Sequence, residues 1–123
     1  MPIIANSSLQ VFNLPGLKHK TLASGADQLR HVEVWMRRLD PGAATPEHYH
    51  ECEEVIVVLK GSGRLSVGDE ASDFGPGTTL ICPPKSVHQL VNSGTEEMLL
   101  IAGLSETPAR VFAPDSSLVP LPW

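Results

Sequence analysis

Short apolar runs separated by glycine and proline are the feature that most constrains how this chain can fold. Its 123 residues include ten glycines and eleven prolines, and these are scattered along the whole length. Runs such as 55–59 and 98–104 are typical of β-strands, and the glycines and prolines between them mark turns. No segment combines helical spacing of apolar residues with capping residues. The pattern predicts an all-β fold, and the length predicts one domain.

The charge and the amino terminus exclude several classes of protein. A formal net charge of −5 without a basic cluster argues against a nucleic-acid partner. No run of apolar residues is long enough to predict a membrane-spanning helix. Residues 1–10 lack the basic region and apolar core of a secretory signal, so we expect a cytoplasmic protein. In that compartment Cys52 and Cys82 would be reduced thiols.

Two histidines separated by one residue, His48 and His50, predict a metal site. On an extended chain, residues i and i+2 point to the same face, about 6.6 Å apart at a rise of ~3.3 Å per residue. Glu54 can add a carboxylate oxygen if the chain turns after His50. His88 lies in a second stretch rich in glycine and proline, residues 75–92. Imidazole and carboxylate ligands suit divalent transition metals, so we expect one mononuclear site built from these four residues.

The two stretches resemble the two sequence motifs of the cupin superfamily. The residues that match the first motif in type and spacing are Gly42, His48, His50, Glu54 and Gly61. Those that match the second are Gly77, Pro83, His88 and Asn92, and Lys85 departs from it because cupins usually have glycine there. The resemblance implies a double-stranded β-helix, the cupin jelly-roll barrel, with a metal site of three histidines and one glutamate. It also implies a homodimer.

In this interpretation, residues 1–123 form a single cupin barrel with an N-terminal strand or arm at 1–30 and a proline-rich tail at 107–123. Residues 116–123 are apolar but rich in proline, so we expect them to lie extended over a surface without forming a regular strand. We expect one or both termini to cross to the partner in the dimer. His19, between two lysines, is interpreted as a solvated loop histidine. The β-branched run 55–59 predicts a strand covered on both faces.

The strand expected at 31–40 and the second motif supply candidate pocket residues. Apolar and polar side chains alternate along 31–40, and we assign the face with Val34 and Met36 to the barrel interior. Trp35 and Arg37 would then point outward. Leu90 shares the parity of the histidine in the second motif and is the third candidate for the pocket lining.

The predicted function follows from a metal with open coordination positions. We expect one divalent transition ion per chain, Fe, Mn, Ni, Co, Cu or Zn, and the four ligands are the only catalytic residues predicted. Four protein ligands leave two positions free on an octahedral ion, which suits a dioxygenase or another oxidoreductase acting on a small organic molecule. One alternative is a module that binds a small ligand without turnover, because acid and base residues are scarce. Another is an isomerase or decarboxylase that uses the metal as a Lewis acid.

Overall fold

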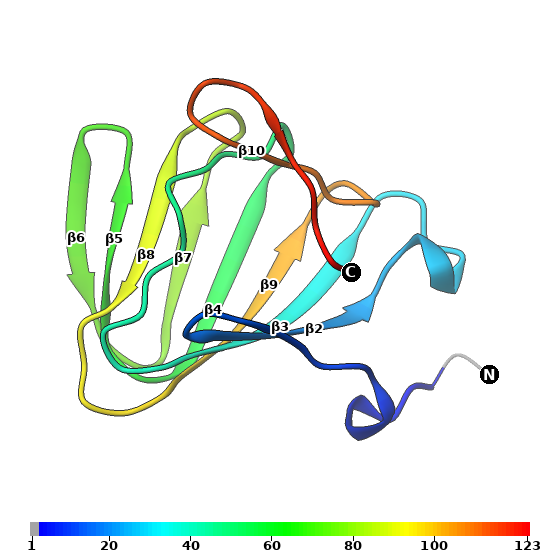
Figure 1. Cartoon of the computed structure of the whole chain (residues 1–123), viewed down its shortest axis with the longest axis horizontal. Coiled ribbons are helices and arrows are strands. Elements are labelled where there is room, and N and C mark those ends of the chain that lie inside the picture. The colour runs from blue at the N-terminus through cyan, green and yellow to red at the C-terminus, as the bar shows by residue number, and fades with distance from the viewer. Residues whose placement is uncertain (1–2) are drawn as a thin grey trace.

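The computed structural model describes residues 3–123 and contains strands and two short 3-10 helices (Figure 1). The all-β prediction is confirmed. The helices are η1 (Asn6–Ser8) and η2 (Gly25–Asp27). The strands are β1 (Phe12–Leu14), β2 (Leu17–Ala23), β3 (Glu33–Leu39), β4 (Glu54–Lys60), β5 (Gly63–Val67), β6 (Glu70–Phe74), β7 (Thr78–Cys82), β8 (His88–Asn92), β9 (Met98–Leu104), β10 (Val111–Phe112) and β11 (Leu118–Val119). Within 3–123, no helix has the length and apolar character needed to span a membrane.

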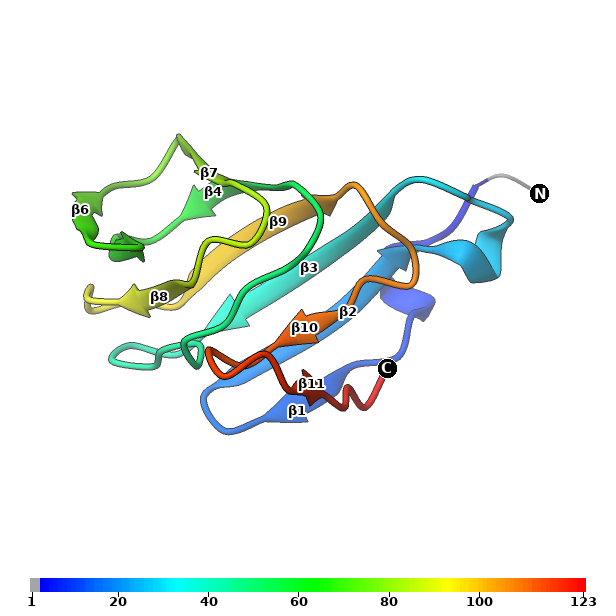
Figure 2. The same cartoon turned by 90° about the horizontal axis from the view of Figure 1, so that it is seen from above.

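Two facing sheets form the barrel. The larger sheet has the strand order β1-β2-β3-β9-β4-β7, and the smaller has the order β6-β5-β8. Residues 42–50 extend the smaller sheet beside β8, through isolated bridges at Ala44–Val91 and His48–His88. Beyond them, β10 and β11 pair with each other. Figure 2 shows β8 and β10 lying opposite β9 and β3, so the space between the two layers is the barrel interior.

Strands β4 and β9 show how the larger sheet is built. Along β9 buried and half-buried residues alternate, and β4 places Ile56 and Val58 inside. On the outer face of β4, Val55 and Val57 are 40% and 39% exposed. The prediction that both faces of the run 55–59 are covered is therefore wrong. The β-branched residues follow strand propensity on both faces, but only the inner face packs against the second layer.

The turn after β4 explains the glycine at the end of the first motif. Gly61 has a φ of +98°, a value that L side chains rarely adopt. A Cβ atom at this position would lie 2.9 Å from the Cα of Met98 at the start of β9. Only glycine therefore permits both the turn and the close approach of β9.

The assignment of the two faces of β3 was wrong. Trp35 and Leu39 are fully buried, Glu33 is buried beside them, and Val34 and Met36 lie on the opposite, outer face. The indole Nε1 of Trp35 donates a hydrogen bond of 2.6 Å to Glu33, so the carboxylate can be buried as a partner of the indole. Alternation of apolar and polar side chains predicts a strand but not which face is buried. Here the hydrogen bond between Trp35 and Glu33 selects the buried face.

His19 and residues 116–123 both differ from what the sequence predicted. His19 lies on β2 and is fully buried, so its interpretation as a solvated loop histidine was wrong. Its imidazole stacks on the indole of Trp123 with ring centroids 3.5 Å apart. The expectation that residues 116–123 form no strand was also wrong, because β11 pairs with β10. The prolines of the tail lie outside the paired residues, where a missing N–H costs no ladder hydrogen bond.

Candidate metal centre

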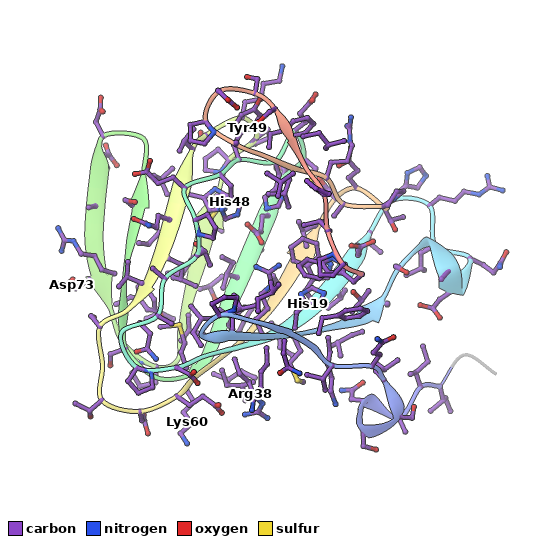
Figure 3. All side chains as sticks on the ribbon, viewed as in Figure 1. His19, Arg38, His48, Tyr49, Lys60 and Asp73 are labelled. Atoms are coloured by element: carbon purple, nitrogen blue, oxygen red, sulfur yellow. The ribbon has the colours of Figure 1, made fainter. Side chains whose placement is uncertain are left out.

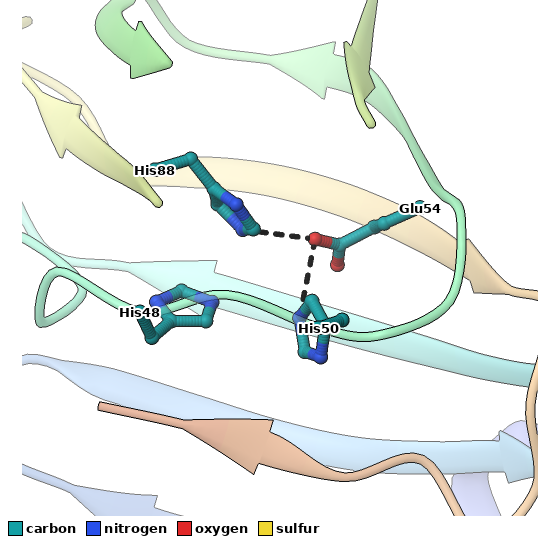
Figure 4. A group of neighbouring side chains, drawn as sticks. All are labelled: His48, His50, Glu54 and His88. Carbon is teal, nitrogen blue, oxygen red and sulfur yellow. Dashed lines mark ion pairs between the residues drawn. The ribbon is translucent and has the colours of Figure 1, made fainter. Parts of the chain in front are cut away.

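The structure brings the four predicted ligands together inside the barrel (Figure 4). His48 and His50 lie on the segment beside β8, Glu54 begins β4 and His88 begins β8. All four are buried, and one possible ligand atom from each lies within 4.8 Å of those of the others. Residues from two sheets thus converge on one point, as a mononuclear site requires.

Backbone carbonyl groups fix the orientation of the three imidazoles. In each case Nδ1 faces a carbonyl oxygen. The pairs are His48 with Pro46 at 2.7 Å, His50 with Arg110 at 2.7 Å and His88 with Ser86 at 3.1 Å. Because a carbonyl oxygen can only accept, each Nδ1 must carry the hydrogen. The Nε2 lone pairs are then free for a metal, and the carbonyls hold the rings as the outer partners of histidine ligands commonly do.

The unpaired atoms of the cluster fit a cation. His50 Nε2, His88 Nε2 and Glu54 Oε1 are buried and have no hydrogen-bond partner. Glu54 Oε1 lies 3.4 Å from the Nε2 of His50 and 3.1 Å from that of His88. With neutral imidazoles, lone pairs face one another at these distances. A divalent metal placed among them would satisfy every one of these atoms.

The protonation states also suit metal binding. Burial, with a smaller contribution from His88, lowers the pKa of His48 to about 4, so this imidazole is neutral at pH 7. Burial raises the pKa of the Glu54 carboxyl, but the neighbouring imidazoles of His50 and His88 outweigh burial and hold this pKa below its usual range. Metal ligands must be deprotonated, and these two already are.

The two cysteines play no part in the cluster. Cys82 pairs with Glu54 in the sheet, and burial together with this carboxylate raises the pKa of its thiol to about 12. Burial also raises the pKa of Cys52. Both remain protonated thiols at neutral pH, whereas the thiolate is the form that binds metals.

Lys85 keeps the turn that glycine usually makes in the second cupin motif. Its φ is 64°, in the left-handed region, and its backbone N–H donates a 2.7 Å hydrogen bond to the carbonyl of His50. The substitution therefore changes the strain of the turn and leaves its link to the ligand segment intact.

Two cavities adjoin the ligands. The inner one has about 20 Å³, the space of one water molecule, and its lining includes Glu54, His88 and Leu90. The outer one has about 260 Å³ and is lined from His48 to the C-terminal tail, including Trp123. Its lining is mainly apolar.

Of the predicted pocket residues, Leu90 lines the inner cavity, while Val34 and Met36 lie outside both cavities. Met36 lines a separate hollow on the outer face of the barrel. The sequence reasoning missed Arg37 and Thr45, which line both cavities, and Trp123. Assigning the other face of β3 to the barrel interior would have revealed Arg37. For Trp123, the signal was an aromatic residue at the end of an apolar tail.

Comparison with known proteins identifies the family. Residues 2–121 match the family described as Auxin binding protein. Auxin-binding protein 1 from Arabidopsis thaliana is 34% identical over 134 residues, which cover 98% of this chain and 67% of that protein. The chain belongs to the auxin-binding protein family. Auxin-binding protein T85 from Nicotiana tabacum is 32% identical over 135 residues, covering 98% of this chain and 72% of the relative.

Solved structures confirm the cupin fold. The polyketide cyclase RemF from Streptomyces resistomycificus has a TM-score of 0.73 at 23% identity, over 88% of this chain and 82% of that one. A single-residue variant of the oxalate decarboxylase of Bacillus subtilis has a TM-score of 0.78 at 20% identity, over 94% of this chain and 31% of that one. At these identities the likeness concerns the fold, and the resemblance to cupins stated from the motifs is confirmed.

Proposed function

We propose that this protein binds a small, largely apolar organic acid at a divalent transition metal held by His48, His50, Glu54 and His88. The observation that carries the proposal is the position of the buried ligand cluster beside a mainly apolar cavity of about 260 Å³. His48 belongs to both the cluster and the cavity wall. A ligand in this cavity can therefore reach the metal with a polar end and keep an apolar body under the tail.

The metal would supply positive charge and free coordination positions for a carboxylate oxygen. The chain's own residues would supply the contacts with the rest of the ligand. Leu17, Val111 and Trp123 offer apolar surface for the body of the ligand, and small-molecule sites are commonly apolar with a few placed polar groups. The names of the relatives support this ligand class, because auxins such as indole-3-acetic acid are small aromatic carboxylic acids.

A dioxygenase, the function first expected from the sequence, is the second candidate. The free coordination positions favour it, since they would accommodate both an organic substrate and O₂. Scarcity of acid and base groups favours binding without turnover. Apart from the metal ligands, the charged side chains that line the two cavities are Arg37 and Glu47, and Glu47 is exposed.

The test compares metal-free protein with protein loaded separately with Zn, Mn, Fe, Ni, Co or Cu. Calorimetric titration with indole-3-acetate, naphthalene-1-acetate and hexanoate should show binding in at least one metal form and none in the metal-free protein or in His88→Ala. Oxygen consumption with the same compounds should stay at the background rate. Acid binding that persists without metal would contradict the proposal, and multiple turnovers with O₂ would favour the dioxygenase.

A further inference from the structure

One cationic side chain in the cavity wall makes no direct ion pair with any described residue. Arg37 points inward from β3 and lines both the inner cavity beside Glu54 and His88 and the outer cavity under the tail. It therefore stands where the two cavities meet, next to the candidate metal centre.

Among residues 3–123, the carboxylate that acts on the guanidinium of Arg37 is that of Glu54, without direct contact, and Glu54 is already a candidate metal ligand. The one hydrogen bond of the guanidinium runs from Nε to Nδ1 of His19, at 3.1 Å, and the guanidinium makes no ion pair with a carboxylate. By contrast, Arg38, Arg64 and Arg110 each pair with a surface carboxylate. Burial lowers the pKa of Arg37 to about 10, so it remains a cation at neutral pH. Arg37 is half-buried, and an unpaired charge partly withdrawn from water is costly, so an anionic ligand would lower that cost.

Neighbouring side chains hold this guanidinium in place. Its central carbon lies 4.5 Å from the ring centroid of Trp35 and 5.2 Å from that of Trp123. His19 accepts through Nδ1, so its Nε2 carries the hydrogen and donates to the hydroxyl of Thr21 at 2.9 Å. Burial, and to a lesser extent Arg37, lowers the pKa of His19 to about 3, which keeps it neutral. The Nε hydrogen is used inside the protein, and both Nη groups are left without a partner among the described residues.

We propose that Arg37 is a specificity-determining residue, and that its Nη groups bind the carboxylate of the ligand beside the metal while His19 orients the guanidinium. The inference rests on the proposed function and adds the group that distinguishes acids from neutral molecules of the same shape. A guanidinium matches a carboxylate with two parallel N–H donors, a geometry that an amide or an alcohol cannot use equally. The expected ligands are monocarboxylates with an apolar body.

A pair of adjacent arginines provides a matched test. Arg37→Gln removes the charge in the cavity, and Arg38→Gln removes one on the outer face, where Arg38 points away from the barrel (Figure 3). The probes are naphthalene-1-acetate and its neutral isostere naphthalene-1-acetamide, titrated into metal-loaded protein. Arg37→Gln should lower the affinity for the acid about 10- to 100-fold, the loss expected for a hydrogen bond between charged groups. Affinity for the amide should stay the same, and Arg38→Gln should behave as the wild type.

Metal content and the visible spectrum of the Co form should be unchanged in Arg37→Gln, which separates ligand recognition from metal binding. If the metal-loaded wild type binds no acid, both this inference and the proposed function are overturned. Three results together would overturn only the role of Arg37. These are binding of the acid by the wild type, loss of that binding in His88→Ala, and an Arg37→Gln variant that keeps the wild-type ratio of acid to amide affinity.

Two further variants keep the test decisive if Arg37→Gln does not fold. Arg37→Lys retains the charge without the planar fork and should lose part of the preference for the acid, so an unaltered ratio in this variant would contradict the contact. His19→Phe retains a ring against Trp123 but removes the acceptor. A reduced ratio supports the orienting role of His19, and an unaltered ratio overturns it.

Discussion

Replacing Glu54 with glutamine should stabilise the metal-free protein while it abolishes metal binding. Without a metal, the carboxylate oxygen faces two imidazole nitrogens at 3.1 and 3.4 Å, and all three atoms are acceptors when the imidazoles are neutral. The amide group of glutamine has nearly the same shape and can donate its hydrogens to these nitrogens. The repulsive contact then becomes a hydrogen-bonded one.

The expected gain follows from the cost of buried unsatisfied groups, which is about 1–3 kcal/mol each. Urea denaturation at pH 8 with EDTA should therefore give Glu54→Gln a free energy of unfolding about 1–3 kcal/mol above that of the wild type. For a domain of this size, that corresponds to a rise of roughly 4–12 °C in melting temperature. Metal at about 1,000 times its Kd should reverse the order, since it stabilises the wild type by about 4.1 kcal/mol.

Glu53→Gln is the matched control because Glu53 is the exposed neighbour of Glu54, and it should change stability by less than about 0.5 kcal/mol. A metal-free Glu54→Gln protein that is less stable than the metal-free wild type would refute the reasoning. That result would mean that the carboxylate is already satisfied, for example by a proton shared with His88.

Three further predictions concern the turn, the pH dependence and the assembly. Lys85→Gly should raise the free energy of unfolding by about 1 kcal/mol, because the left-handed φ of 64° strains lysine; an unchanged urea midpoint would contradict this. The native pKa of His19, about 3, lies below its ordinary value of 6.5, so stability should fall as pH drops from 6.5 towards 3. His19→Phe should flatten that decline in a urea series across this range, and an equally steep series would remove His19 as its cause. Light scattering should give about twice the chain mass of 13.2 kDa, as expected for the homodimer, and the mass of a single chain would refute the dimer.

The metal motifs were the most predictable part of this protein. Spacing placed His48 and His50 on one face of an extended segment, and a second stretch rich in glycine and proline, distant in sequence, supplied His88. Both stretches resemble the cupin motifs. The structure brings the three histidines within 4.8 Å of one another together with Glu54. Short-range periodicity and motif spacing are sufficient here because the barrel topology is common to the superfamily.

The faces of β3 could not be predicted in the same way. Alternation gives two possible phases, and a count of apolar side chains favoured the one with Val34 and Met36 inside. The structure selects the other because Glu33 becomes the buried partner of the Trp35 indole, a pairing that hydropathy does not capture. The correct phase also turns Arg37 into the cavity, so one unforeseen hydrogen bond changed the predicted chemistry of the site.

The C-terminal tail shows a second limit of sequence reasoning. Its prolines indicated an irregular extended segment, but β11 forms between them and Trp123 folds back onto His19. This contact joins residues about a hundred positions apart and depends on shape within the assembled barrel. Local propensity contains no information about such a contact.

The most direct test of the account is a crystal structure of the metal-loaded protein with naphthalene-1-acetate, using anomalous scattering at the absorption edge of the metal. The account predicts one metal per chain, at roughly 2.0–2.3 Å from Nε2 of His48, His50 and His88 and from an oxygen of Glu54. It also predicts the carboxylate of the ligand on that metal and on Arg37, with the aromatic body under the tail. A metal bound elsewhere, or a ligand whose carboxylate points away from the metal to the surface, would contradict it.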